Sequence, residues 1–322
     1  MSNRVTGPQA QQGFTGCRVA VTGGSGFIGS AVISALVRGG ADVVQIRRAG
    51  GYVPSQVVPS EPRVRVVAWP DDMTQLAREL EGVSTIFHLA AAGIHSEAAD
   101  AAELISVNVL ATVSLFKAAS AAGVDRFIYA ASCFQYGSGS HFRETDPLQP
   151  CSPYAASKAA GEWMLLTLSD RFRVTPVSAR LFTVYGPGEA AHRVIPYTAR
   201  RALAGHPIQL TGGVQTRDYV YIDDAVSALI ALWRTEQAGG RVFNICSGVE
   251  ISIRQVAEMI CDLTRSESEL QFGVRPYRAT EVWHLSGDPE RSKQMLGWAA
   301  ITSMTQGLSQ TIDWIKRADP DV

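Results

Sequence analysis

The stretch Val19-Ala20-Val21-Thr22-Gly23-Gly24-Ser25-Gly26-Phe27-Ile28-Gly29-Ser30 decides the fold of this chain. A short β-branched run stops at a glycine cluster, and a helical pattern follows. Gly23 permits a tight turn, Gly26 lets a pyrophosphate approach the backbone, and Gly29 lets the new helix pack closely on the strand. The helix N-terminus offers N–H groups and partial positive charge to phosphates. The spacing predicts a dinucleotide-binding turn, and the alternative is a glycine-rich turn without a ligand.

The bulk composition is that of a globular protein. The chain has 322 residues, with 46% hydrophobic and 18% charged residues, enough for one large domain or two modest ones. The net charge of -1 gives no field that attracts nucleic acid or an anionic membrane surface. No apolar run reaches the roughly 18 residues of a membrane span. We therefore expect neither nucleic acid nor a membrane as a partner.

The cysteine and histidine residues show no metal-binding or disulfide pattern. The five cysteines are odd in number and have no C-x-x-C spacing, which argues against a disulfide framework and a zinc site. The six histidines show no metal spacing either. The expected location is a reducing cytoplasm, and no metal is predicted. Residues 1–15 are polar and lack an apolar core segment, so they are predicted to be a disordered tail.

Strand and helix patterns alternate along the first half of the chain. Strands are expected at 18–22, 42–47, 63–68, 85–90, 126–131 and 174–181, and helices at 27–38, 73–80, 98–122 and 153–172. Residues 49–62 are rich in Gly, Pro and Ser and are predicted to form a loop. The strands are nearly all apolar, which indicates a parallel sheet covered on both faces. The fold class is therefore α/β, a doubly wound Rossmann sheet.

The pattern becomes less regular after about residue 184. We predict a dinucleotide-binding domain over 16–183, with 218–247 interleaved, and a smaller, mainly substrate-binding domain over 184–322. Ligands of such sheets bind at the carboxyl ends of the strands. The motifs at the strand ends are therefore expected to converge on one cleft.

Tyr154 and Lys158 lie one helical turn apart on one face of a predicted helix. A nearby ammonium favours tyrosinate and makes the phenol a better proton donor. Ser132 ends the fifth strand, where its hydroxyl can hold a carbonyl oxygen near Tyr154. The alternatives are a half-buried Tyr with a solvated Lys, and a Ser that satisfies loop backbone.

These motifs together resemble the extended short-chain dehydrogenases/reductases, the nucleotide-sugar epimerase, dehydratase and reductase group. The matching pieces are TGGSGFIG, FHLAA, YxxxK, RLFTVYGPG, TRDYVYIDDA and LGW, in the group's order and over nearly the whole chain past residue 16. The resemblance implies a bound NAD(P), a Ser132/Tyr154/Lys158 catalytic triad and a nucleoside-diphosphate sugar substrate. It also implies a homodimer that pairs the two long helices.

The resemblance also implies which residues bind the cofactor. They are Gly23, Gly26, Phe27, Ile28, Gly29, Arg47, Arg48, Leu89, Ala90, Ala91, Asn108, Ala130, Tyr154, Lys158 and Phe182. By the same carry-over, the predicted substrate contacts are His95, Cys133, Phe134, Thr183, Arg217 and Arg275. For Arg217 and Arg275 the predicted ligand is the diphosphate, and the alternative is an ion pair on the surface or between domains.

Departures from the group's pattern narrow the function. The second strand ends in Arg47 and Arg48 where NAD users have an acid, and arginines suit a 2′-phosphate. NADP(H) is therefore predicted over NAD, and the alternative is a pair of solvated arginines. Cys133 and Phe134 stand where 4,6-dehydratases have an acid pair, so elimination of water lacks its groups. Thr183 stands where the group often has an Asn that contacts the sugar or its diphosphate. The position of the sugar at this point is therefore left open.

The leading hypothesis from the sequence is an NADPH-dependent ketoreductase of a nucleoside-diphosphate deoxysugar, with C4 as the favoured position of the keto group. The segment Arg275–Val282 carries the likeness to such reductases. Two alternatives stay open, an NAD(P)-dependent nucleotide-sugar epimerase and a non-catalytic NADP(H)-binding regulator. The sequence does not identify the nucleotide, the sugar, the carbon or the product stereochemistry.

Overall fold

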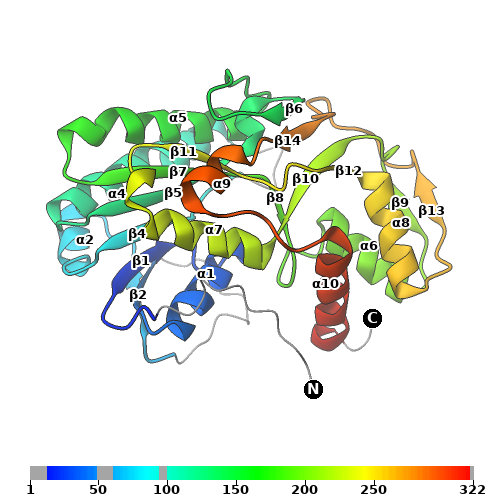
Figure 1. Ribbon diagram of the computed structural model, residues 1–322, viewed down its shortest axis with the longest axis horizontal. Coiled ribbons are helices and arrows are strands. Elements are labelled where there is room, and N and C mark those ends of the chain that lie inside the picture. The colour runs from blue at the N-terminus through cyan, green and yellow to red at the C-terminus, as the bar shows by residue number, and fades with distance from the viewer. Residues whose placement is uncertain (1–12, 49–60, 94–99, 320–322) are drawn as a thin grey trace. The chain divides into compact units, whose positions relative to one another are not determined.

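The computed structural model describes residues 13–48, 61–93 and 100–319 (Figure 1). These residues form two compact units, each built from several chain segments. Unit 1 comprises residues up to Ala130 together with Ala160–Ser178 and Leu229–Arg241. Unit 2 comprises Ala131–Ala159, Ala179–Ala228 and residues from Val242 onward.

A seven-stranded sheet has the order β11-β7-β5-β4-β1-β2-β3. Its strands in chain order are β1 (Arg18–Thr22), β2 (Asp42–Arg47), β3 (Val64–Ala68), β4 (Thr85–His88), β5 (Arg126–Ser132), β7 (Thr175–Leu181) and β11 (Val242–Ile245). The pairs β1·β2, β1·β4, β2·β3 and β4·β5 are parallel. This order confirms the predicted Rossmann class, since the chain winds outward both ways from β1.

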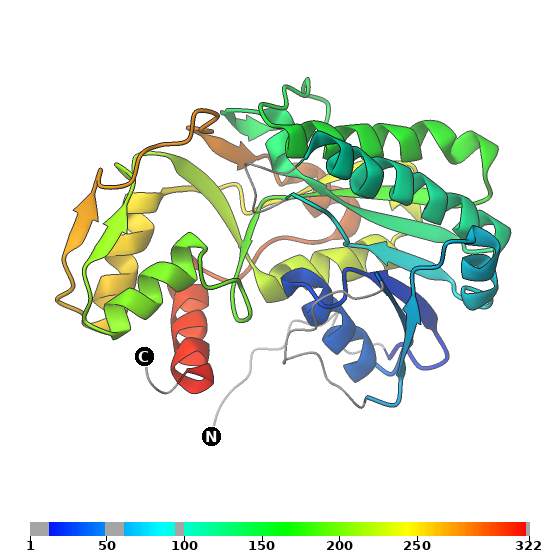
Figure 2. The ribbon, with the colours of Figure 1, turned by 180° about the vertical axis from the view of Figure 1, so that it is seen from behind.

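Helices of unit 1 cover both faces of this sheet (Figure 2). They include α1 (Phe27–Arg38), α2 (Met73–Glu79), α3 (Ala101–Ile105), the π-helical segment η1 (Ser106–Leu110) and α4 (Ala111–Ala121). Parts of α5 (Pro153–Leu168) and α7 (Ile222–Arg234), and all of η3 (Ser169–Arg171) and η4 (Glu236–Ala238), also belong to this unit. Aromatic rings anchor them, because Phe116 of α4 meets Phe127 edge-on at 5.4 Å and Trp233 of α7 meets Phe87 at 5.9 Å.

Unit 2 holds short strands and most of the later helices. Its elements are η2 (Cys133–Tyr136), β6 (Gly139–Phe142), β8 (Thr183–Tyr185), α6 (Val194–Leu203), β9 (Ile208–Leu210), β10 (Thr216–Tyr221), β12 (Glu250–Ser252), α8 (Ile253–Thr264), β13 (Leu270–Phe272), β14 (Leu285–Gly287), α9 (Glu290–Leu296) and α10 (Met304–Ala318). Strand β10 pairs with β8 in parallel and with β12 antiparallel. A buried carboxylate ties β10 to the segment before β12, because Asp218 accepts hydrogen bonds from the N–H groups of Ser247 and Gly248 at 2.8 and 2.9 Å.

The division into units differs from the predicted domains at three places. Residues 131–159 and 179–183 belong with the later segments, and the interleaved piece of unit 1 is Leu229–Arg241 rather than 218–247. The structure also differs at the end of the predicted tail. Phe14 is buried, with its ring 5.1 Å from that of Trp233 and the Arg234 guanidinium 4.7 Å from its centre. An aromatic side chain with this partner anchors the chain before β1.

The predicted helix 98–122 is not one regular helix. Residues 101–121 pass through α3, η1 and α4, and the π-helical turn lies around Asn108. Such turns occur often at functional sites, because they re-aim a side chain. The segment Ala101–Ala121 is long and apolar enough to cross a membrane by length and composition, with 39% of its apolar window buried. A single helix of this kind is weak evidence, because core helices of globular proteins pass the same test.

Candidate active site

The glycine-rich turn of unit 1 has the geometry that the sequence predicts. Gly23 has φ +69°, and an added Cβ would lie 2.6 Å from the backbone nitrogen of Ala90 at the end of β4. At Gly29 an added Cβ would lie 2.1 Å from the Gly23 carbonyl oxygen, so only glycine lets α1 start so close to the turn. At Gly26 the nearest atom would be 3.2 Å away and no other lies within 4 Å. The turn therefore leaves open space beside Gly26, as a pyrophosphate cradle requires.

The first turn of α1 faces this space with backbone donors. Gly26 is the N-cap of α1 and has no side chain that could cap an N–H group. The N–H groups of Phe27, Ile28 and Gly29 belong to the first turn, which has no intrahelical acceptors. These donors and the helix dipole suit an anionic ligand. The residues present thus fit the phosphates of a dinucleotide cofactor.

A hydrogen-bonded core holds the strand ends beside the turn. His88 bridges β1 and α4, with Nδ1 2.7 Å from the Thr22 hydroxyl and Nε2 2.8 Å from the Thr112 hydroxyl. The Asn108 amide grips the backbone of Ala92, accepting from its N–H at 2.8 Å and donating to its carbonyl at 3.1 Å. Asn108 thus fixes the segment after Leu89, Ala90 and Ala91, and its predicted contact with the cofactor stays a prediction.

The end of β2 carries the predicted cofactor-selecting arginines. Ile46 pairs with Thr22, so Arg47 follows at the edge of the sheet where the glycine turn begins. Arg47 is half-buried and Arg48 is exposed. Gln45, two residues earlier, is 1% exposed, and neither of its amide atoms has a hydrogen-bond partner within the described part of the chain. Sequence patterns did not single it out, since a polar residue within a strand gives no local signal of burial.

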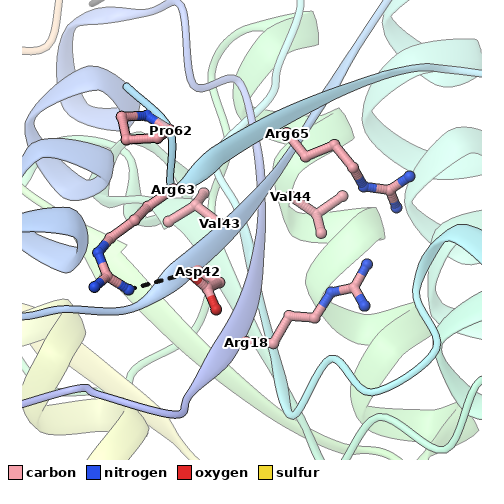
Figure 3. Close-up of a pocket in the computed structure, with 7 residues that line it drawn as sticks. All are labelled: Arg18, Asp42, Val43, Val44, Pro62, Arg63 and Arg65. Carbon is pink, nitrogen blue, oxygen red and sulfur yellow. Dashed lines mark hydrogen bonds and ion pairs between the residues drawn. The ribbon is translucent and has the colours of Figure 1, made fainter. Parts of the chain in front are cut away.

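A hollow of about 230 Å³ lies at the opposite edge of the sheet (Figure 3). Arg18, Asp42 and Arg63 line it, and Arg63 pairs with Asp42 at 3.2 Å. Arg18 and Asp42 begin β1 and β2, so the hollow sits at the amino ends of the strands. Ligands of open α/β sheets bind at the carboxyl ends. This hollow is therefore not part of the dinucleotide site.

The predicted catalytic residues lie together in unit 2. Ser132 is 6% exposed and ends β5, and Tyr154 is the second residue of α5. Their side chains are hydrogen-bonded to each other. The Ser132 hydroxyl also accepts from the N–H of Phe134 at 3.3 Å, which fixes its position at the start of η2. Lys158, one turn beyond Tyr154, is 2% exposed and so is not a solvated surface lysine.

The surroundings keep the Tyr154 phenol protonated. Burial raises the pKa of Tyr154 well above its usual value, while the hydrogen bond from Ser132 and the positive charge of Arg193 lower it. Burial also raises the pKa of the neighbouring Cys133 thiol to about 12, so this cysteine is neutral and unreactive. At neutral pH the arrangement presents a phenol that can donate a proton beside a hydroxyl that can hold an oxygen.

Other predicted contacts in unit 2 have different surroundings. Arg217 pairs with Glu281 at 2.7 Å, and both side chains are nearly buried. The Arg275 guanidinium lies 4.3 Å from the centre of the Tyr197 ring. Phe182 is 3% exposed and packs against Gly287. The roles of these residues in binding stay predictions.

The remaining predicted positions complete the comparison. Thr183 begins β8 opposite Tyr219, Phe134 is half-buried, and Ala130 is buried within β5. His95 lies outside the described residues. Within the described part of the chain no group of three or more His, Cys, Asp or Glu side chains could hold a metal ion.

Two residues near Tyr154 were missed by the sequence patterns. Glu189 and Arg193 lie between β8 and α6 and form an ion pair of 3.3 Å. The Arg193 charge acts on Tyr154, and that of Glu189 on Tyr219. The spacing of four residues was visible in the sequence, but it occurs often on solvated surfaces.

Comparison with known proteins gives the family. Residues 19–246 match the family described as "NAD dependent epimerase/dehydratase family". A mouse dTDP-D-glucose 4,6-dehydratase is 30% identical, covering 93% of this chain and 89% of that protein. A Mycolicibacterium smegmatis UDP-glucose 4-epimerase is also 30% identical, covering 93% of this chain and 98% of that protein. The solved structure of MoeE5 with UDP-glucuronic acid and NAD is 32% identical, with a TM-score of 0.84 and coverage of 94% and 99%.

Proposed function

Because the chain belongs to the NAD-dependent epimerase/dehydratase family, we propose that it is an NAD(P)-dependent oxidoreductase of nucleoside-diphosphate sugars. The observation that carries this proposal is the Tyr154 phenol hydrogen-bonded to Ser132, with Lys158 buried one turn away. A non-catalytic NADP(H)-binding regulator has no need of this arrangement. The bound nicotinamide supplies the site that takes up or gives a hydride.

The chain's own residues handle the oxygen and the proton. Ser132 holds the oxygen of the reacting sugar carbon, and Tyr154 exchanges a proton with that oxygen. Lys158 provides positive charge near the phenol and so eases the loss of its proton. The turn at Gly23–Gly29 holds the cofactor phosphates through the first turn of α1.

Epimerisation is the first candidate reaction. The M. smegmatis relative is named a UDP-glucose 4-epimerase, and the alignment covers 98% of its length. The mouse relative is named a 4,6-dehydratase, but this chain has Cys133 and Phe134 after Ser132 where elimination needs an acid and a base. The neutral Cys133 thiol cannot replace them. We therefore propose that a sugar carbinol centre is inverted rather than dehydrated.

Ketoreduction is the second candidate, and two observations favour it. The Tyr154 phenol is held protonated by burial, which suits proton donation to a ketone. Arg47 ends β2 where a 2′-phosphate partner would stand, which favours NADPH as the cofactor. A reductase consumes one NADPH for each product, whereas an epimerase has no net demand for reductant.

One assay separates the two candidates. Purified protein is given a nucleotide 4-keto-6-deoxyhexose with NADPH, and separately UDP-glucose with NAD+. Interconversion of UDP-glucose and UDP-galactose, without loss of reduced nicotinamide, supports the epimerase. Stoichiometric oxidation of NADPH with a 4-hydroxy sugar as product supports the ketoreductase. If neither reaction occurs and no nucleotide sugar binds, the proposed function is wrong.

We also propose that two copies pair through the long helices of unit 1. Ile105 and Leu110 expose 52% and 60% of their surface, and Trp163 and Met164 of α5 expose 56% and 40%. Gly161 lets α5 approach η1 closely, since an added Cβ would lie 2.6 Å from the Asn108 carbonyl oxygen. Clustered exposed apolar side chains on neighbouring helices suit a second copy of this chain.

A further inference from the structure

Glu189 is a buried carboxylate with one oxygen that lacks a partner. It lies in the turn between β8 and α6, and its side chain is 7% exposed. Its Oε1 accepts a hydrogen bond from Nε of Arg193 at 3.3 Å. Its Oε2 is buried and has no hydrogen-bond partner among the described residues. A buried oxygen without a donor costs free energy, so such groups usually have a role that the unliganded protein does not show.

The pair of Glu189 and Arg193 acts on the proposed catalytic tyrosine through the charge of Arg193. The positive charge of Arg193 lowers the pKa of Tyr154, which requires the two groups to be close within unit 2. The charges of Glu189 and Arg193 also act on the phenol of Tyr219 in β10. The ion pair that includes the partnerless oxygen is therefore coupled through Arg193 to Tyr154, the residue expected to react with the sugar.

Burial and Arg193 set the ionisation of Glu189, and a ligand beside the carboxylate would change it. Burial raises the pKa of Glu189 to about 7, and the charge and hydrogen bond of Arg193 act against that rise. A hydrogen-bond donor brought to Oε2 would favour the charged carboxylate. A carboxylate brought there would be repelled by it.

A solvent-exposed ion pair in the same unit provides a comparison for the pair of Glu189 and Arg193. Arg254 and Glu258 have the same four-residue spacing on α8, with side chains 45% and 50% exposed and 4.0 Å apart. Water can form hydrogen bonds with both side chains, so neither group lacks a partner. Glu189 differs because its carboxylate is removed from water without a second donor.

We propose that Glu189 determines sugar specificity: its Oε2 accepts a hydrogen bond from a hydroxyl of the bound sugar, and its charge rejects sugars that carry a carboxylate. This inference rests on the proposed function, since it places a nucleotide sugar beside Tyr154. It predicts a substrate with an uncharged hexose rather than a hexuronic acid. The structural neighbour MoeE5 has been solved with UDP-glucuronic acid and with UDP-glucose, so both sugars are fair probes of this site.

The test is a binding measurement with the full chain saturated with its nicotinamide cofactor. Titration calorimetry first compares UDP with dTDP, and then the glucose and glucuronic acid forms of the nucleotide that binds. The unmodified protein should bind the glucose form roughly 10- to 100-fold more tightly, the range for a hydrogen bond to a charged group. Glu189→Gln should reduce this ratio at least about tenfold, with nucleoside-diphosphate affinity unchanged.

Two further variants serve as controls for the binding measurement. Glu258→Gln removes an exposed carboxylate of the α8 pair and should leave the ratio unchanged. Glu189→Asp keeps the charge on a shorter side chain, so it should still reject the glucuronic acid form while binding glucose less tightly. Circular dichroism establishes that each variant is folded. An unfolded Glu189→Gln protein leaves Glu189→Asp to decide, because loss of its rejection of glucuronic acid would overturn the inference.

The outcomes distinguish a failure of the role of Glu189 from a failure of the proposed function. A protein that binds no nucleotide sugar overturns the proposed function, and the role of Glu189 with it. A protein that binds both sugars with the same ratio before and after Glu189→Gln overturns only the role of Glu189. Preference of the unmodified protein for the glucuronic acid form would do the same.

Discussion

Replacing Glu189 by Gln should change how stability depends on pH, even without any ligand. Burial raises the pKa of Glu189 in the folded protein to about 7, against a reference value of 4.5. Below pH 4.5 the carboxyl is protonated in both states, so it costs nothing. As the pH rises from 4.5 to about 7 the unfolded chain releases this proton first, and the free energy of unfolding falls. Above pH 7 the loss is complete.

The size of the loss follows from the difference between the folded and unfolded pKa values. A tenfold difference in proton affinity between the two states corresponds to about 1.4 kcal/mol, so Glu189 lowers the free energy of unfolding by about 3 kcal/mol at pH 8. The side chain is 7% exposed, so solvent screening reduces this figure little. With the usual unfolding entropy per residue, a chain of 322 residues gains roughly 4 °C in melting temperature when this loss is removed.

Differential scanning calorimetry at pH 5, 6, 7 and 8 measures the effect. Glu189→Gln should gain melting temperature relative to the unmodified protein as the pH rises, with most of the gain by pH 7. Glu258→Gln removes an exposed carboxylate in the same unit. Its melting temperature should depend on pH in the same way as that of the unmodified protein. Parallel curves for Glu189→Gln as well would refute the reasoning, because a buried carboxylate with one partnerless oxygen must couple its ionisation to folding.

Three further variants test the site and the assembly. Tyr154→Phe keeps the ring and removes the proton donor, so turnover should fall roughly 10²–10⁴-fold in steady-state kinetics while cofactor binding persists. Arg47→Asp should shift preference from NADPH towards NADH, because it removes a 2′-phosphate partner and adds a repulsive charge; fluorescence titration with both cofactors measures this. Trp163→Asp places a charge on a ring that is 56% exposed, and sedimentation should then show monomers in place of dimers.

Each of these variants has an outcome that contradicts its premise. Near-normal turnover of Tyr154→Phe would remove this residue from the chemistry. Equal affinity of the unmodified protein for both cofactors would leave Arg47 as a solvated arginine. If the unmodified protein is a monomer, or if Trp163→Asp stays dimeric, the proposal that these exposed helices form the dimer interface is wrong. Lys117→Asp, at an exposed position of α4 that has no apolar side chain, serves as the control in that experiment.

Local sequence patterns predicted most of the elements of unit 1. The strands at 18–22 and 42–47 and the helix at 27–38 have the bounds that β-branched runs, Gly39 and the apolar spacing indicate. The roles of Gly23 and Gly29 were also visible, since a positive φ and a close helix start both require a missing Cβ. These features depend on neighbours in the chain, which a sequence displays directly.

The Ser132, Tyr154 and Lys158 cluster could be predicted only in part from local sequence. Tyr154 and Lys158 share a helix face, so their relation follows from helical spacing alone. The contact with Ser132 joins residues that are 22 positions apart, and the sequence could place it only through likeness to a family. The structure supplies the burial that holds the phenol protonated.

The sequence by itself determined the α/β class and the glycine turn, because both depend on backbone preferences within a few residues. It also led to the prediction that Ser132, Tyr154 and Lys158 react, through helical spacing and likeness to a family. Tertiary structure alone decided which segments form each unit, that Arg217 pairs with Glu281, and that Glu189 is buried with one oxygen unpaired among the described residues. Burial and charge are properties of surroundings assembled from distant parts of the chain. A Glu and an Arg four residues apart form a solvated pair on α8, whereas after β8 they form a pair whose Glu side chain is buried, and only packing makes that difference.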